Sequence, residues 1–240
     1  MEKQETKMWS YKMTHDAMMA PNPFFGMLTL ATCKPLIRKS AKTKPGVWIA
    51  GWTACTTHNS PFAESKTSRC DMGKEKLIYL AKVSEVLPYE QYGEKYPQKR
   101  PVENADIHNA TYYGDNYYYK ENGEEKCAPN NQHHFEMIKE DWRGKNAVIC
   151  QEFYYFTPEN RLSAADFEDL IHKHVGAAMK QGVRVDEFIA YVKRCVIELG
   201  YSQGIVGTLP IHSDERMAGQ TACNNTTSSC GRKKKGGCVK

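Results

Sequence analysis

The sequence has no apolar run close to the ~18 residues that a membrane-spanning helix needs, which argues against a membrane protein. Its opening residues, MEKQETK, are charged and lack the apolar stretch of a secretory signal peptide, so we expect a cytoplasmic protein. No C-x-x-C pair occurs among the nine cysteines, so the spacing of zinc ribbons and thioredoxin-like redox sites is missing. The odd number of cysteines favours reduced thiols over a disulfide framework.

A large excess of positive charge is missing too. The net charge is +5, but residues 223–240 contain five basic residues and no acid, which leaves 28 basic and 28 acidic residues at positions 1–222. A protein that holds duplex DNA by its phosphates usually has a basic excess, and this body has none. Between Asp16 and Glu64 the chain has no acid, while five basic residues fall there: Lys34, Arg38, Lys39, Lys42 and Lys44. This local excess favours a pocket for one or a few phosphates over a long nucleic-acid track.

A proline-flanked segment precedes these cations. Pro21 and Pro23 fix their own φ angles, and Asn22 between them is pushed out of the helical region. Gly26 can adopt backbone angles that other residues avoid. The segment therefore predicts a rigid support for the residues that follow it, with Asn22 and Phe24 as candidate ligand-binding residues.

The run Cys33-Lys34-Pro35 with Arg38 is the strongest chemical signal. A thiol beside a cation has a lowered pKa and gains nucleophilicity, so Cys33 is a candidate nucleophile. Lys34 and Arg38 lie one helical turn apart and can face one phosphate together. The alternative is that Cys33 is a buried apolar residue and the cations form a solvated face. We favour anion binding over a nucleophilic cysteine.

Other candidates are aromatic or acidic. Trp48 and Phe24 can stack on a base, although aromatic residues on strands more often belong to a core. Asp16, at the end of a predicted strand, can hydrogen-bond a base edge or a ribose hydroxyl, or can simply complete a turn.

The long polar and aromatic segment 97–143 holds two further groups of candidates. Gly114 precedes Asp115 and Asn116, and His133 and His134 follow about eighteen residues later. We expect Asp115, Asn116 and His133 to contact ligand. His134 is a candidate general base with Asp115 orienting it. The spacing is not diagnostic of a metal site, so we predict no metal and no cofactor.

Periodicity predicts an α+β fold with enough apolar residues, 40%, for a sizeable core. Expected strands cover 9–13, 27–32, 47–52, 76–87 and 146–156. Expected helices cover 35–42, 89–96 and a packed pair at 163–200, and expected loops cover 56–74 and 97–143.

Several of these motifs together resemble one known family. They include Trp9-Ser10-Tyr11, His15-Asp16, Ala20-Pro21-Asn22-Pro23-Phe24, Thr29-Leu30-Ala31-Thr32-Cys33-Lys34-Pro35-x-Ile37-Arg38, Val47-Trp48-Ile49-x-Gly51, Gly114-Asp115-Asn116 and His133-His134. In these the chain resembles the nucleotide modification associated domain 2 family of phages and bacteria over roughly residues 8–157. The resemblance implies a link to DNA base hypermodification.

A weaker similarity is to PUA-like barrels of the EVE and ASCH kind. It rests on a short basic helix, a glycine-led strand and an apolar strand, here at 36–42, 46–52 and 77–86. Domains of that shape resemble base readers, in which a small barrel accepts a flipped or free base in an aromatic pocket.

We therefore expect a PUA-like, mixed β-barrel domain at 8–157, a C-terminal helical extension at 158–214 and a disordered basic tail at 215–240. The hypothesis is a protein that binds a nucleotide or modified base in an aromatic, cationic pocket. In a phage it would act in the host cytoplasm and could sequester a nucleotide immune signal. The alternatives are an enzyme that modifies a base through Cys33 or His134, and a scaffold within a modification complex. Nucleic acid is a possible partner, and the oligomeric state is open.

Overall fold

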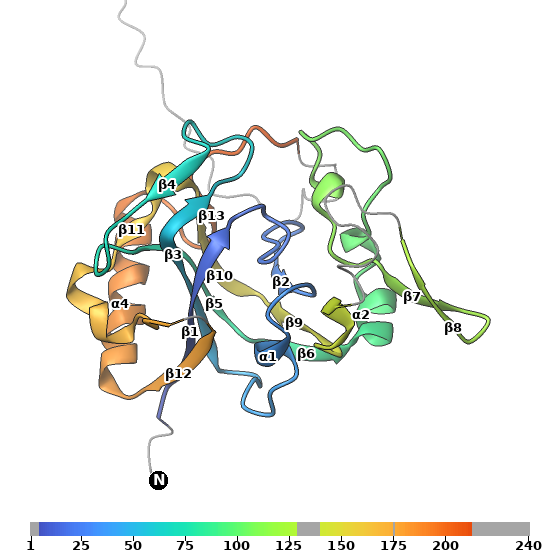
Figure 1. Ribbon diagram of the computed structural model, residues 1–240, viewed down its shortest axis with the longest axis horizontal. Coiled ribbons are helices and arrows are strands. Elements are labelled where there is room, and N and C mark those ends of the chain that lie inside the picture. Colours follow the sequence, from blue (N-terminus) through green and yellow to red (C-terminus); the bar gives the residue numbers. More distant parts are fainter. Residues whose placement is uncertain (1–4, 129–139, 175, 213–240) are drawn as a thin grey trace, which may run out of the picture.

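The computed structural model describes residues 5–128, 140–174 and 176–212, and its centre is a large mixed sheet (Figure 1). The sheet runs in the order β12-β1-β3-β5-β10-β13, and two short strands pair with β3 and β5. Its strands are β1 (Lys7–His15), β3 (Trp48–His58), β4 (Thr67–Arg69), β5 (Lys76–Lys82), β10 (Glu152–Phe156), β11 (Leu162–Ser163), β12 (Ala177–Gln181) and β13 (Gly204–Val206). The pairs β1–β3 and β10–β13 are parallel, and the other pairs in this sheet are antiparallel.

The remaining elements surround this sheet. A second sheet has the order β2-β9-β6, and a separate hairpin joins β7 to β8. These strands are β2 (Leu28–Leu30), β6 (Glu85–Pro88), β7 (Tyr118–Glu121), β8 (Glu124–Cys127) and β9 (Asn146–Cys150). The helices are α1 (Pro35–Arg38), α2 (Tyr89–Lys95), η1 (Pro97–Lys99), η2 (Ala110–Tyr113), η3 (Pro158–Asn160), η4 (Ala165–Leu170) and α4 (Val183–Glu198).

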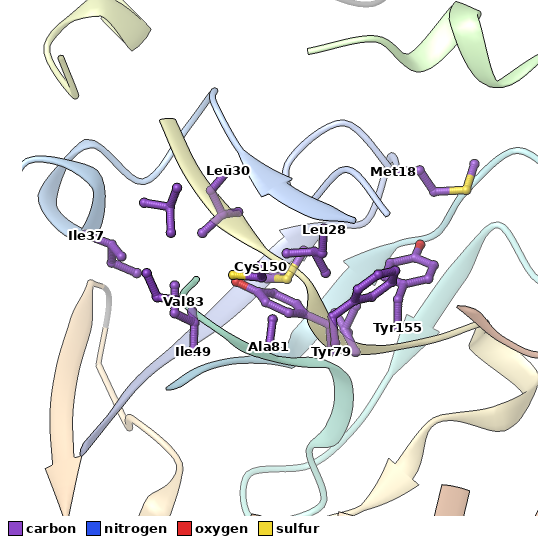
Figure 2. Packing of buried hydrophobic residues seen from close by; sticks show 14 of the residues in the cluster. Met18, Leu28, Leu30, Ile37, Ile49, Tyr79, Ala81, Val83, Cys150 and Tyr155 are labelled. Carbon is purple, nitrogen blue, oxygen red and sulfur yellow. The ribbon is translucent and has the colours of Figure 1, made fainter. Parts of the chain in front are cut away.

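Both faces of the large sheet are buried. Alternating side chains of β1 point to opposite faces, so Trp9 and Tyr11 enter the core beneath the small sheet while Met8 enters the core beneath α4 and η4. Figure 2 shows the first of these cores, where Leu28 and Leu30 of β2 lie above Tyr79 of β5. The large sheet is therefore the middle layer, between the small sheet and the helices α4 and η4.

The two long apolar runs that were predicted as single strands each divide between the two sheets. Residues 76–87 form β5 in the large sheet and then β6 in the small one, and residues 146–156 form β9 and then β10. At the corner, the backbone N–H of Gln151 donates to Oγ of Ser84 (3.0 Å), and the N–H of Ser84 donates to the carbonyl of Ile149 (2.8 Å). The described strands form no closed barrel, so a mixed α/β fold is confirmed and a PUA-like barrel is not.

The prediction of two packed helices at 163–200 needs correction. Its second helix is present as α4, but the first is not: residues 165–170 form short 3₁₀ turns interrupted at Phe167 (φ −131°, ψ 28°), and residues 177–181 form β12. Phe167 and Leu170 are buried all the same, because tight turns can bury apolar residues at the spacing that suggested a helix. Since β11, β12 and β13 pair with β5, β1 and β10, this segment completes the large sheet; residues 215–240 lie outside the described residues.

Two predicted loops also contain regular structure. The segment 56–74 includes the end of β3 and its partner β4, and 97–143 includes η1, η2 and the β7–β8 hairpin. In the part of the chain that the structure describes, no helix combines the length and apolar character needed to cross a membrane.

Candidate functional site

A pocket of about 240 Å³ lies between α2, the β7–β8 hairpin and residues 142–145. Four aromatic residues, two lysines, one acid and one proline line it: Tyr89, Tyr118, Tyr119, Trp142, Lys126, Lys145, Glu90 and Pro88. The ring centroid of Tyr118 lies 4.3 Å from that of Tyr89 and 5.2 Å from that of Trp142. The pocket therefore combines clustered aromatic rings with two ammonium groups, which suits a flat, anionic ligand.

Hydrogen bonds to main-chain carbonyls hold this aromatic wall in place. The hydroxyl of Tyr89 lies 3.0 Å from the carbonyl oxygen of Ala31 and 2.8 Å from that of Asp141. The carboxylate Oδ1 of Asp141 accepts from the backbone N–H of Cys33 (2.5 Å). Asp141 thus joins α2 and the turn before α1 to the segment that carries Trp142.

Arg38 lies at the centre of these contacts and is fully buried. Its guanidinium donates to the carbonyl oxygens of Ala31 (2.6 Å), Cys33 (2.6 Å), Asp141 (2.7 Å) and Asn146 (3.2 Å). These contacts direct its N–H groups at the protein's own main chain, so the geometry does not support the predicted phosphate contact. Arg38 instead connects α1 to β9 and to the residues beside the pocket.

The packing of Arg38 explains why position 144 is a glycine. A Cβ atom at that position would lie 2.4 Å from Cζ of Arg38, closer than real Cβ contacts. Glycine therefore allows the guanidinium to pack directly against the main chain between Trp142 and Lys145.

The structure corrects the prediction of an activated Cys33. Burial raises the pKa of its thiol, and Asp141 raises it further, against the smaller lowering effects of Lys34 and Arg38. The buried carboxylate and the loss of water outweigh the cations that the sequence places nearby. The thiol is therefore less ionised than a free cysteine, not more.

Lys34 stays close to the core. Its Nζ lies 4.5 Å from the centroid of the Tyr11 ring, and burial lowers the pKa of its amine. Cys33 and Lys34 both have left-handed backbone angles (φ 50° and 45°), which few residues other than glycine adopt. Neither residue lines the aromatic pocket.

Asp115 and Asn116 are buried and hydrogen-bonded inside the fold, although Oδ1 of Asn116 has no partner among the described residues. Asp115 accepts from the hydroxyls of Thr29 (2.6 Å) and Tyr92 (2.5 Å), and burial raises the pKa of its carboxyl. The amide Nδ2 of Asn116 donates to the carbonyls of Gly93 (3.2 Å) and Tyr96 (2.8 Å). Asp115 thus joins α2 to β2, and Asn116 binds the C-terminal end of α2. His133 and His134 lie outside the described residues.

Asn22 belongs to the same network, together with a residue that sequence reasoning missed. Its amide donates to the carbonyl of Tyr113 (2.6 Å), and its Oδ1 accepts from Nζ of Lys99 (2.7 Å). Lys99 is fully buried, and burial lowers its pKa from 10.5 to about 7. Its position in a basic, polar stretch gave no sign that it would be internal.

The side chains of Asp16, Trp48 and Phe24 are also buried inside the fold. Asp16 is buried with Arg161 (2.6 Å) and the Tyr155 hydroxyl (2.8 Å), and burial raises the pKa of its carboxyl. Trp48 and Phe24 are 4% and 1% exposed, in the two separate cores. None of the sequence-predicted residues in the described part of the chain lines the aromatic pocket.

No lining residue of the pocket was predicted individually, and only four of the eight lie in a region that was predicted to be functional. Tyr118, Tyr119, Lys126 and Trp142 all lie in segment 97–143, whose length and aromatic content had marked it as functional. A second, shallower hollow of about 420 Å³ is lined by Phe25, Gly26, Met27, Gln151, Glu152 and Gln203. Within the described ranges, no three His, Cys, Asp or Glu residues come together to hold a metal ion.

Comparison with known proteins gives one match. A family model described as nucleotide modification associated domain 2 matches residues 5–204, which covers α4 and all the described strands except the last two residues of β13. No curated protein and no solved structure matches the chain.

Proposed function

Because the chain belongs to the nucleotide modification associated domain 2 family, we propose that it binds a nucleotide or a modified base in the aromatic pocket described above. The observation that carries this proposal is the grouping of Tyr89, Tyr118, Tyr119 and Trp142 with two lysines around one pocket. The family is linked by its description to nucleotide modification, and this pocket is the site whose chemistry matches such a ligand.

The pocket chemistry supports a base with a phosphate attached. A base that stacks on an aromatic side chain gains about 1–3 kcal/mol, whatever its sequence identity. Lys126 and Lys145 add positive charge at the same pocket, where a phosphate would lie. The volume of about 240 Å³ is below the ~300–1,000 Å³ of typical ligand sites, so one base fits inside with its sugar and phosphate at the rim.

Two finer ideas rest on this site. A PUA-like base reader is supported by the two sheets that share a corner, together with an aromatic pocket beside the smaller one. Sequestration of a nucleotide signal by a phage protein requires tight binding but no catalysis. The pocket would provide that binding.

The enzyme alternative has less support. The raised pKa of Cys33 disfavours a nucleophilic thiolate, and Asp115 already accepts two hydrogen bonds within the fold. Turnover of a base or nucleotide that was abolished by His134→Ala would favour the enzyme over the binding protein.

Calorimetry with nucleoside monophosphates, carrying ordinary and modified bases, tests the proposal. We expect Tyr119→Ala and Trp142→Ala each to weaken binding by roughly 5- to 150-fold, the equivalent of ~1–3 kcal/mol per stacked base. Tyr201→Ala is the matched control, because Tyr201 is also partly exposed but lies beside α4. The proposal fails if no nucleotide binds, or if both pocket variants bind as tightly as the parent protein.

A further inference from the structure

Three exposed lysines lie within six residues of one another, directly after α1. Lys39, Lys42 and Lys44 follow α1, and all three side chains are exposed. In the described part of the chain no carboxylate lies within ion-pair distance of them, whereas Lys95 and Lys193 pair with Glu85 and Glu152. These three cations are therefore uncompensated, in a stretch of sequence that has no acid from residue 17 to residue 63.

The loop that carries them is fixed in place. Thr43 is buried between Lys42 and Lys44, and its hydroxyl donates to the carbonyl of Ile37 (2.6 Å) while it accepts from the Trp9 indole N–H (2.9 Å). The end of the loop is held by the N–H of Gly46, which donates to the carbonyl of Val83 (2.9 Å). Because Thr43 points inward, its two neighbours are held on the outer surface, so the cations are positioned before any ligand arrives.

A contact between Arg38 and Asn146 links the lysine loop to the edge of the pocket. The amide Nδ2 of Asn146 donates to the carbonyl of Arg38 (3.2 Å), and Arg38 donates back to the carbonyl of Asn146 (3.2 Å). Lys39 follows Arg38, and Lys145, which lines the pocket, precedes Asn146, so two exposed lysines flank one contact. Figure 1 shows α1 beside β9 and β6, with the loop before β3 extending from it.

We propose that Lys39, Lys42 and Lys44 bind successive phosphates of a single-stranded polynucleotide whose unstacked base enters the aromatic pocket. This inference rests on the proposed function, and it names the substrate as a strand instead of a free nucleotide. A mononucleotide has no phosphates to place on cations beyond the pocket rim, whereas a strand does. A duplex is disfavoured because its bases are stacked and because residues 1–222 carry no net positive charge.

The salt dependence of binding tests this inference. The ligands are a fluorescent, mixed-sequence single strand of about ten nucleotides, the same sequence as a duplex, and the mononucleotide that binds best. We expect the strand to bind at least tenfold tighter than the mononucleotide at low salt. In the triple variant Lys39→Gln/Lys42→Gln/Lys44→Gln, the slope of log K against log[salt] should shrink by about 2, since each phosphate contact on a single strand contributes ~0.7.

A second triple variant, Lys66→Gln/Lys74→Gln/Lys173→Gln, removes the same charge from exposed lysines outside the loop after α1 and should leave the slope unchanged. Mononucleotide affinity should stay within about twofold in both triple variants. The inference is overturned if the mononucleotide binds but the strand binds no tighter, if the duplex binds as well as the strand, or if the control variant lowers the slope equally. If neither ligand binds the parent protein, the proposed function fails and this inference fails with it.

Discussion

The guanidinium of Arg38 donates to the carbonyl oxygen of Asp141 at 2.7 Å, and the next residue, Trp142, forms part of the pocket wall. The hydroxyl of Tyr89, another residue that lines the pocket, donates to the same carbonyl oxygen at 2.8 Å. One carbonyl group therefore fixes the spacing between two of the aromatic rings. The motif Cys33-Lys34-Pro35 with Arg38, which was predicted to bind phosphate, instead supports the pocket wall through its contacts with Asp141.

Replacing Arg38 should loosen both the fold and the pocket. Arg38→Met leaves four carbonyl oxygens without their buried donor, so we expect a loss of about 3 kcal/mol or more in the free energy of unfolding, measured by urea denaturation. Arg38→Lys should restore only part of it, because an ammonium cannot reproduce the planar fork. The control is Lys39→Met, on the adjacent exposed side chain. Equal stability of Arg38→Met and the control would contradict the role assigned to Arg38.

Much of the fold was predictable because the local sequence pattern of many helices and strands indicates their type. The alternation through Trp9, Tyr11 and Met13 predicted β1, and the apolar spacing of 185–199 predicted α4; both are confirmed. Pro35 correctly marked the start of α1, but the helix ends at Arg38 and does not extend to Lys42 as predicted. The breaks at Ser84 and Gln151 were not predictable, because an apolar strand that changes sheet has the same local pattern as one that continues.

The candidate site was harder to predict because the same polar side chains serve binding and burial. Asp115, Asn116 and Asn22 have the residue types of a ligand site, yet their partners are Tyr92, backbone carbonyls and Lys99, contributed by segments about 20 to 80 positions away. Such pairings arise only when the chain folds, so spacing along the sequence carries no information about them. For the same reason, the sequence marked segment 97–143 as functional but did not identify the residues that line the aromatic pocket.

The buried ion pair of Asp16 and Arg161 should behave as a unit. Asp16 is 0% and Arg161 1% exposed, and Nε of Arg161 is buried without an acceptor among the described residues. Removing one partner leaves an uncompensated charge, so Arg161→Met alone should cost about 3–5 kcal/mol in unfolding free energy. The double variant Asp16→Leu/Arg161→Met should cost less than the sum of the two single variants. Additive effects in urea denaturation would show that the two residues do not interact.

The thiol of Cys33 should react slowly with alkylating reagents. Because burial raises its pKa, a smaller fraction is thiolate at neutral pH, and each pKa unit lowers that fraction about tenfold. With iodoacetamide at pH 7.5, we expect Cys33 to be alkylated more slowly than the exposed Cys55, as followed by peptide mass spectrometry. Cys33→Ala should keep nucleotide binding. Faster labelling of Cys33 than of Cys55 would return it to consideration as a nucleophile.

Lys99 should make stability depend on pH in a defined window. Its pKa is about 7 in the fold and 10.5 for a solvated lysine, as in the unfolded chain, so between these values the unfolded chain binds more protons. The contribution of Lys99 to the free energy of unfolding should therefore rise with pH between about 7 and 10.5, by up to about 1.4 kcal/mol per unit, and level off at its lowest value below pH 7, where the amine is charged in both the folded and the unfolded chain. Urea denaturation of the parent protein and of Lys99→Met at pH 7, 8 and 9 isolates this contribution, because other titrating groups cancel in the difference. If that difference does not change with pH, the amine of Lys99 keeps its ordinary pKa and its burial has no titration consequence; the NMR titration of its Nζ in the parent protein provides an independent check.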